Sequence, residues 1–217
     1  MAAIYLLRHG QASFGSADYD VLSELGELQA KALGDELRRR AVRVHAVWSG
    51  TLRRQLATAA GCLPAAGIDL AVGQDPRWNE YDHLGLVPTG QGGPADSARR
   101  FQAQLDEALS RWLAGDERVG TSGTWTEFSG GAFAAVTDVF AALPRGGTAL
   151  VFTSAGLISA ICARLLHLPP EGFLALNRTM ANASITKLVS GRSGVSLLSY
   201  NEHAHFEGDA RELLTYR

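Results

Sequence analysis

The sequence contains little cysteine and no long apolar segment. Only two cysteines occur among its 217 residues, Cys62 and Cys162, and their spacing matches no metal-binding pattern. Both lie in apolar parts of expected helices, so we expect reduced, buried thiols. No apolar run is long enough to span a bilayer, and the first residues do not resemble a secretion signal. These absences predict a cytoplasmic protein without a membrane partner.

The chain also lacks an excess of charge of either sign. Its formal net charge is −2, and no basic run is interleaved with aromatic residues. The longest basic run, Arg38–Arg40, closes an expected helix, where cations complement the helix dipole. Nucleic acid is therefore not an expected partner. The length and a hydrophobic share of 46% predict one domain, residues 1–217, with a proper core.

Apolar runs that alternate with helical patterns predict the architecture. Strands are expected at residues 4–7, 44–48, 70–72, 148–152, 184–189 and 195–200, the last two as a hairpin. Helices are expected after Ser23, over 52–62, after Thr124 and over 155–166. The first has its apolar positions at helical spacing, at Leu25, Leu28, Ala32, Leu33 and Leu37. The pattern predicts an α/β fold, a three-layer α/β/α sandwich around a mostly parallel, mixed sheet.

Residues 81–123 interrupt this alternation. A glycine-rich loop at 90–94 precedes one amphipathic helix that carries Phe101, Leu105, Ala108, Leu109 and Trp112 on one face. We interpret the segment as an insertion that forms a lid or wall. The glycines lack the phosphate-loop pattern, so a flexible connector is the preferred interpretation of the loop.

The first candidate site follows the first expected strand, where Arg8, His9 and Gly10 succeed the apolar run 4–7. In open α/β sheets this edge is where ligands bind. A guanidinium beside an imidazole suggests an anion that is held by one group and attacked by the other. Taken alone, the three residues are equally consistent with an Arg-His pair that only caps the end of a strand.

Three further segments carry polar groups where a strand meets a helix or loop. Arg54 lies in the first turn of a helix, where amides and a guanidinium together suit an anion, whereas Arg53 fits a surface charge better. Glu80 is either a general acid or an ordinary loop acid. Ser154 and Ala155 offer a hydroxyl and a backbone amide to an anion, or simply the small residues that a tight turn needs.

Together these segments resemble the histidine phosphatase superfamily, phosphoglycerate mutase-like branch, across nearly the whole chain. Five segments match its pattern in the right order: Leu7–Gly10, Leu22–Ala30, Ser49–Ala59, Asn79–Glu80 and Asn201–Phe206. The resemblance implies that His9 attacks a phosphoryl group, that Arg8 and Arg54 neutralise its oxygens, and that Glu80 protonates the leaving group. It also implies a small phosphorylated substrate and no metal or other cofactor, since arginines replace the cation.

Two positions depart from the family pattern. Ser154 occupies the place of the second active-site histidine, and Gly15 stands where many members carry asparagine. A serine donates one neutral hydrogen bond but carries no positive charge. The two departures are consistent with two alternatives, a phosphatase of reduced activity and a phosphate-ligand-binding protein with little or no turnover. A phosphoglycerate mutase is a weaker alternative, since nothing suggests the exclusion of water that it needs.

Three other histidines have candidate roles. His83, three residues after Glu80, is a possible auxiliary donor in place of the missing histidine; a lid histidine without catalytic duty is the simpler interpretation. His203 and His205, as alternate residues of a strand, would share a face, but we expect a structural role and no metal. The sequence indicates neither the substrate nor the oligomeric state.

Overall fold

The computed structural model describes residues 1–13, 20–82, 94–115, 118 and 122–216, with only the backbone described at 94–103 and 170. The strands are β1 (Ala2–Arg8), β2 (Ala46–Ser49), β3 (Val72–Gln74), β4 (Thr148–Thr153), β5 (Ile185–Gly191) and β6 (Gly194–Glu202). The helices are α1 (Glu24–Arg39), α2 (Arg53–Ala66), α4 (Pro94–Leu113), α5 (Trp125–Ala142), α6 (Ala155–Leu165) and α7 (Pro170–Thr179), with short 3₁₀ turns at Pro76–Trp78, Ala204–Phe206 and Gly208–Leu213. Within the described part of the chain, no helix has the length and apolarity that a membrane crossing requires.

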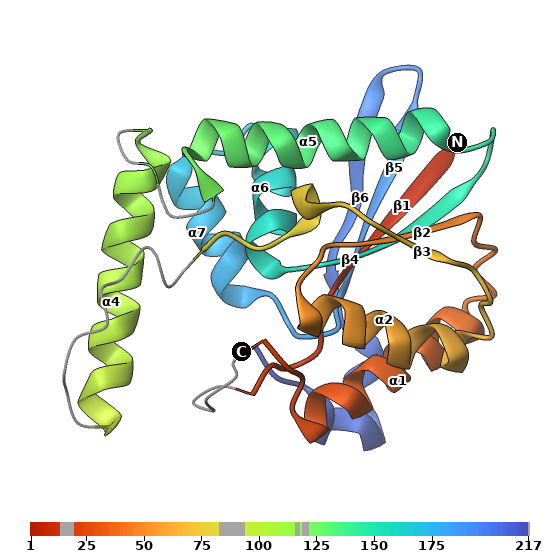
Figure 1. The fold of residues 1–217 in the computed structure, drawn as a ribbon, viewed down its shortest axis with the longest axis horizontal. Helices are drawn as coiled ribbons and strands as arrows, with labels where there is room; N and C mark the ends of the chain where they lie inside the picture. The colour runs from red at the N-terminus through yellow and green to blue at the C-terminus, as the bar shows by residue number, and fades with distance from the viewer. Residues whose placement is uncertain (14–19, 83–93, 116–117, 119–121, 217) are drawn as a thin grey trace.

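The six strands form one mixed sheet in the order β3-β2-β4-β1-β5-β6. Strands β1 to β4 pair in parallel, and β5 and β6 continue the sheet as an antiparallel hairpin. Helices α5 and α6 cover one face, and α1 and α2 cover the other (Figure 1). The predicted three-layer sandwich with a mostly parallel, mixed sheet is therefore confirmed.

Alternation along β1 divides the core into two layers. Ile4 and Leu6 pack with α5 and α6, whereas Tyr5 and Leu7 pack with α1 and α2. Successive strand residues point to opposite faces, so a strand covered on both sides reads as a continuous apolar run. This arrangement places Arg8 and His9 at the edge where the run ends.

Two details of the predicted elements are wrong. The third strand starts at Val72 instead of residue 70, because its pairing with Val47 in β2 fixes the edge strand, and Leu70 is exposed. On α1, Leu28 is exposed, and Gln29 is buried instead. The Gln29 amide accepts a hydrogen bond from Gln11 N and donates one to Leu213 O, which periodicity does not reveal.

One helix was not predicted at all. Helix α7 begins with proline at its first position and glutamate in its first turn, both typical of a helix start. It buries Phe173 against α4 and α5. The start signal was therefore present in the sequence, but the apolar spacing that usually completes it is short.

Helix α4 joins the rest of the molecule through aromatic residues. Trp112 is fully buried, and its ring centroid lies 5.6 Å from that of Tyr81 and 5.3 Å from that of Phe128. Its indole nitrogen donates to Gly123 O at 2.9 Å. The predicted burial of Ala108, Leu109 and Trp112 is confirmed, while the side chain of Phe101 lies outside the described residues. The role of residues 81–123 as a lid stays a prediction.

Candidate active site

The carboxyl ends of the parallel strands gather the candidate residues at one edge of the sheet. Arg8 pairs in register with Thr153, so His9 and Ser154 follow on neighbouring strands. His9 N donates to Thr153 O at 2.9 Å, and Gly50 N donates to Phe152 O at 3.1 Å. The start of α2 is thereby fixed beside the ends of β1 and β4.

His9 is buried, and its two ring nitrogens have different partners. Nδ1 lies 2.7 Å from Gly10 O, and Nε2 lies 3.2 Å from Arg54 Nε. A carbonyl only accepts and a guanidinium only donates, so Nδ1 carries the hydrogen and Nε2 presents a lone pair. Burial, followed by the charges of Arg54 and Arg8, holds the pKa of His9 well below its usual range. The imidazole is therefore neutral with Nε2 unprotonated, the form in which it is a nucleophile.

Gly10 lets the chain pass very close to α1. A Cβ atom on Gly10 would lie 2.4 Å from Gly26 O, and one on Gly26 would lie 2.2 Å from Gln11 O. Neither backbone oxygen can move without disturbing α1 or the loop after β1. The two glycines therefore set the distance between the His9 loop and the first turn of α1.

Arg54 is held by an acid that the sequence analysis did not single out. Asp20 accepts hydrogen bonds from Arg54 Nη1 at 2.7 Å and from Arg53 N at 2.8 Å. The carboxylate thus caps the start of α2 and fixes the guanidinium that contacts His9. No motif links Asp20 to an arginine 34 positions away, so only the fold reveals the pair. The Arg53 side chain is exposed, as the sequence predicted.

Arg8 is buried and bonds to the backbone of two distant segments. Its Nη1 donates to the carbonyls of Met180 and Tyr216. The charge of Arg8 contributes to the low pKa of His9 and also acts on the carboxyl of Glu80. Arg8, His9, Arg54 and Glu80 therefore share one electrostatic environment, although Glu80 comes from the segment after β3.

Glu80 is positioned by the first turn of α6. Its carboxylate accepts from Gly156 N at 3.0 Å and from Tyr81 N at 3.1 Å. Burial raises the pKa of Glu80, whereas these amides and the two arginines act in the opposite direction. A Cβ on Gly156 would lie 2.3 Å from Glu80 Oε1, so only glycine leaves room for the carboxyl there. A carboxyl with a raised pKa is suited to donate a proton.

Ser154 is fully buried and immediately precedes α6, whose first residue is the buried Ala155. The Ser154 hydroxyl accepts a hydrogen bond from Gln55 Nε2 at 2.9 Å. Gln55 follows Arg54 in the chain, and sequence reasoning assigned it no role. The structure thus brings His9 and Arg54 into contact, and it holds Glu80 and Ser154 beside them through α6 and α2.

Comparison with known proteins agrees with this geometry. The model of the histidine phosphatase superfamily (branch 1) matches residues 4–203.

The chain belongs to this superfamily. A search of curated proteins gave no significant match. Among solved structures, a mycobacterial glucosyl-3-phosphoglycerate phosphatase is 27% identical with a TM-score of 0.69, and the alignment covers 93% of this chain and 99% of that one. Two less similar structures show the fold alone. YhfR of Bacillus stearothermophilus is 21% identical with a TM-score of 0.72, and the alignment covers 95% of this chain and 100% of that one. A phosphoserine phosphatase mutant from Entamoeba histolytica, in complex with phosphoserine, is 19% identical with a TM-score of 0.69, and the alignment covers 94% of this chain and 99% of that one.

The structure leaves two predicted positions untested. His83 and Gly15 both lie outside the described residues. His203 and His205 are described, and they do not share a strand face, because β6 ends at Glu202. His203 Nδ1 lies 2.6 Å from Asn201 O, and His205 Nε2 lies 3.2 Å from Ala183 O. The two imidazoles therefore bind separate backbone carbonyls.

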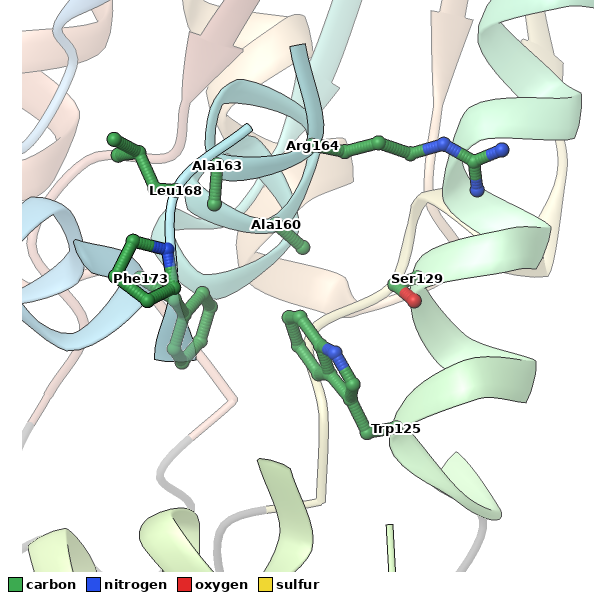
Figure 2. Close-up of a pocket in the computed structure, with 8 residues that line it drawn as sticks. Trp125, Ser129, Ala160, Ala163, Arg164, Leu168 and Phe173 are labelled. Carbon is green, nitrogen blue, oxygen red and sulfur yellow. The ribbon is translucent and has the colours of Figure 1, made fainter. Parts of the chain in front are cut away.

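The protein also has a cavity that none of these site residues lines. A cavity of about 300 Å³ lies between α5, α6 and the start of α7. Figure 2 shows the residues that line it. Trp125, Phe173 and Ala163 give it apolar walls, and Ser129 and Arg164 add polar groups. The Arg164 guanidinium lies 4.3 Å from the centre of the Phe133 ring. Lacking His9, Arg54 and Glu80, the cavity is not where we place the chemistry.

Proposed function

We propose that this protein is a phosphatase that hydrolyses a phosphomonoester through a phosphohistidine on His9. The observation that carries the proposal is the pair of contacts on the imidazole. Gly10 O binds Nδ1, and the Arg54 guanidinium lies at Nε2. A neutral nucleophile is thereby placed beside the cation that would hold a phosphoryl oxygen. Membership of the histidine phosphatase superfamily supports the same chemistry.

In the first step, the lone pair of His9 Nε2 forms a bond to phosphorus while the bond to the leaving oxygen breaks. Arg54 and Arg8 offset the negative charge on the phosphoryl oxygens, and Glu80 gives its proton to the leaving oxygen. In the second step, Glu80 takes a proton from water, the water oxygen bonds to phosphorus, and the bond to Nε2 breaks. The Nδ1–H bond to Gly10 O keeps the ring in one orientation throughout.

The proposed substrate is a small phosphorylated molecule. The relative that is 27% identical is named for the phosphatase reaction on glucosyl-3-phosphoglycerate. Its small anionic substrate is consistent with the two arginines here. We further propose that the chain acts as one domain and that residues 81–123 form the wall that selects the substrate. The aromatic contacts of Trp112 with Tyr81, the neighbour of Glu80, support that assignment.

Release of inorganic phosphate from an aryl phosphate tests the proposal. The wild type is expected to turn over and to carry acid-labile phosphate after rapid quenching with labelled substrate. His9→Ala is expected to lose both signals, while binding of phosphate through the arginines survives in part. Wild-type turnover by His9→Ala would remove His9 from the mechanism.

One observation favours a second candidate, a phosphate-ligand-binding protein with little or no turnover. Ser154 stands where the superfamily carries its second histidine, and a hydroxyl cannot supply that positive charge. Loss of one strong transition-state donor lowers the rate roughly 10²–10³-fold. Tight phosphate binding without phosphate release by the wild type would establish this second function and contradict the first.

A further inference from the structure

Gln55 connects three parts of the site. The side chain is fully buried in the first turn of α2. Its amide nitrogen donates to Ser154 Oγ at 2.9 Å and to Trp78 O at 3.1 Å, and its oxygen accepts from Leu52 N at 3.3 Å. One amide thereby joins the start of α2, the segment that leads to Glu80, and the residue that precedes α6.

These partners fix which way the amide of Gln55 faces. Trp78 O can only accept and Leu52 N can only donate, so nitrogen and oxygen cannot exchange places. Both hydrogens of the nitrogen are then used, one of them on the Ser154 hydroxyl. Ser154 Oγ is the acceptor in that bond, and its own hydrogen points elsewhere. Among the described residues, Gln55 is the only side-chain partner of this hydroxyl.

Ser154 and the proposed nucleophile, His9, each directly follow one of two neighbouring strands. β1 and β4 are neighbours, and adjacent strands are about 4.8 Å apart. Arg54 contacts His9, and the next residue, Gln55, contacts Ser154. Two consecutive residues of α2 therefore bind the residue that follows β1 and the residue that follows β4.

The amide of Gln55 also depends on the absence of a side chain at Gly50. A Cβ on Gly50 would lie 2.0 Å from Gln55 Oε1 and 2.6 Å from Asn79 Oδ1. The chain at Gly50 therefore has no side chain where the amide needs room. A glutamine without exposed atoms, bonded at both ends of its amide, has little freedom to turn.

We propose that Gln55 is a positioning residue that turns the O–H of Ser154 toward a phosphoryl oxygen. The neutral hydroxyl then acts as a fixed donor where other members of the superfamily carry histidine. This inference rests on the proposed phosphatase function and adds a residue to it. Orientation matters because a donor that is already aimed needs no rearrangement when charge develops on the oxygen.

A double-mutant cycle on Gln55→Met and Ser154→Ala tests the inference. Methionine keeps the length of glutamine but offers no N–H to Ser154. Ser154→Ala is expected to lower kcat roughly 10²-fold, the scale of one lost donor. Gln55→Met is expected to lower kcat about tenfold, with KM nearly unchanged, since only the aim of the hydroxyl is lost. The double variant is expected to equal Ser154→Ala alone, because Gln55 then has no hydroxyl to orient.

Gln29→Met is the matched control. Gln29 is equally buried, and it too has an amide with backbone partners, but it does not contact Ser154. Its effect on kcat is expected to multiply with that of Ser154→Ala. If the effects of Gln55→Met and Ser154→Ala multiply in the same way, Gln55 does not act through the hydroxyl and the inference is overturned.

Orthovanadate affinity separates this inference from the proposed function. If the wild type releases no phosphate, the proposed phosphatase function is contradicted. Vanadate binding would still measure the contact between the Ser154 hydroxyl and an oxyanion. Introduced into the wild type, Gln55→Met is expected to weaken vanadate binding. Introduced into the Ser154→Ala variant, it is expected to leave vanadate binding unchanged. Circular dichroism checks that each variant has the native fold. Equal vanadate affinity of the wild type and Ser154→Ala, or no vanadate binding by the wild type, would overturn the inference.

Discussion

The pKa values of His9 and Glu80 are shifted toward each other. Burial is the largest cause in both cases, lowering the pKa of His9 and raising that of Glu80. The proposed mechanism requires a neutral imidazole and a protonated carboxyl in the same molecule. Without these shifts, few molecules would hold both forms at one pH, so the environment of each residue widens the useful range.

The first prediction concerns pH at these residues. The acid-side loss of kcat/KM should have its midpoint below pH 6.5, since the pKa of His9 is lowered, and the alkaline-side loss should lie above pH 4.5, since that of Glu80 is raised. A pH profile on an alkyl phosphate, whose leaving oxygen needs the proton of Glu80, checks both limbs. An acid-side midpoint at or above 6.5 would contradict the assignment of that limb to His9.

The second prediction concerns the leaving group at Glu80. Glu80→Gln removes the proton donor but keeps the shape of the side chain. With an alkyl phosphate, whose leaving oxygen needs a proton, kcat is expected to fall roughly 10²–10⁴-fold. With an aryl phosphate that departs as a stable anion, the loss should be far smaller. Equal losses on the two substrates would show that Glu80 does not protonate the leaving group.

At the scale of elements, the first turn of α6 decides where Glu80 can lie. Gly156 N donates to the carboxylate, and the absence of a side chain at Gly156 leaves it room. The same glycine contacts the ring of Tyr81, where an added Cβ would lie 2.3 Å from Cε1. Helix α6 therefore positions the proposed acid and one end of the aromatic cluster together.

The third prediction is that Gly156→Ala reproduces the leaving-group pattern of Glu80→Gln. The added methyl group would displace the carboxyl, so hydrolysis of the alkyl phosphate should fall more than hydrolysis of the aryl phosphate. Comparative kinetics on the two substrates check this outcome. A uniform loss on both would point to general damage to the fold instead.

Gly130→Ala is the matched control in a helix. A Cβ on Gly130 meets nothing within 4 Å, so the same substitution is free of clashes there. Alanine in a helix interior is expected to raise the free energy of unfolding by about 0.5–1 kcal/mol and to leave kinetics unchanged. Urea denaturation measures the first effect. Loss of stability would contradict the view of α5 as an ordinary helix at this point.

At the scale of the whole molecule, hydrogen bonds connect the last described residues to the segment that carries His9. Thr215 Oγ1 accepts from Gln29 Nε2 at 2.8 Å and donates to Asn182 Oδ1 at 2.9 Å. Asn182 Nδ2 in turn donates to His9 O at 3.4 Å. The last described residues thus lie beside the loop that carries His9 (Figure 1).

The fourth prediction tests this long-range support. Thr215→Val keeps the shape of the side chain but leaves two buried polar groups without their partner, so the free energy of unfolding is expected to fall by about 1–3 kcal/mol. Thr137→Val is the control, because the exposed hydroxyl of Thr137 donates to Phe133 O within α5. Its effect should stay within about 0.5 kcal/mol in urea denaturation. Equal effects of the two substitutions would deny Thr215 a structural role.

The sequence by itself determined the features that depend on short stretches of chain. Apolar runs placed five of the six strands closely, and the Thr124–Glu127 capping box begins α5 as expected. Short motifs also singled out His9, Arg54 and Glu80 as candidates. Such features follow from local periodicity and from the chemistry of neighbouring residues, so they can be read without knowing the fold.

Only the tertiary structure decided the contacts between distant segments. It brought Asp20 to Arg54, bound Gln55 to Ser154 across 99 positions, and set the register of β3. It also set the burial that lowers the pKa of His9. These features depend on which surfaces meet when the chain closes. The sequence of any one segment carries no record of its partner, since hydrogen bonding and desolvation act between residues that the fold alone brings together.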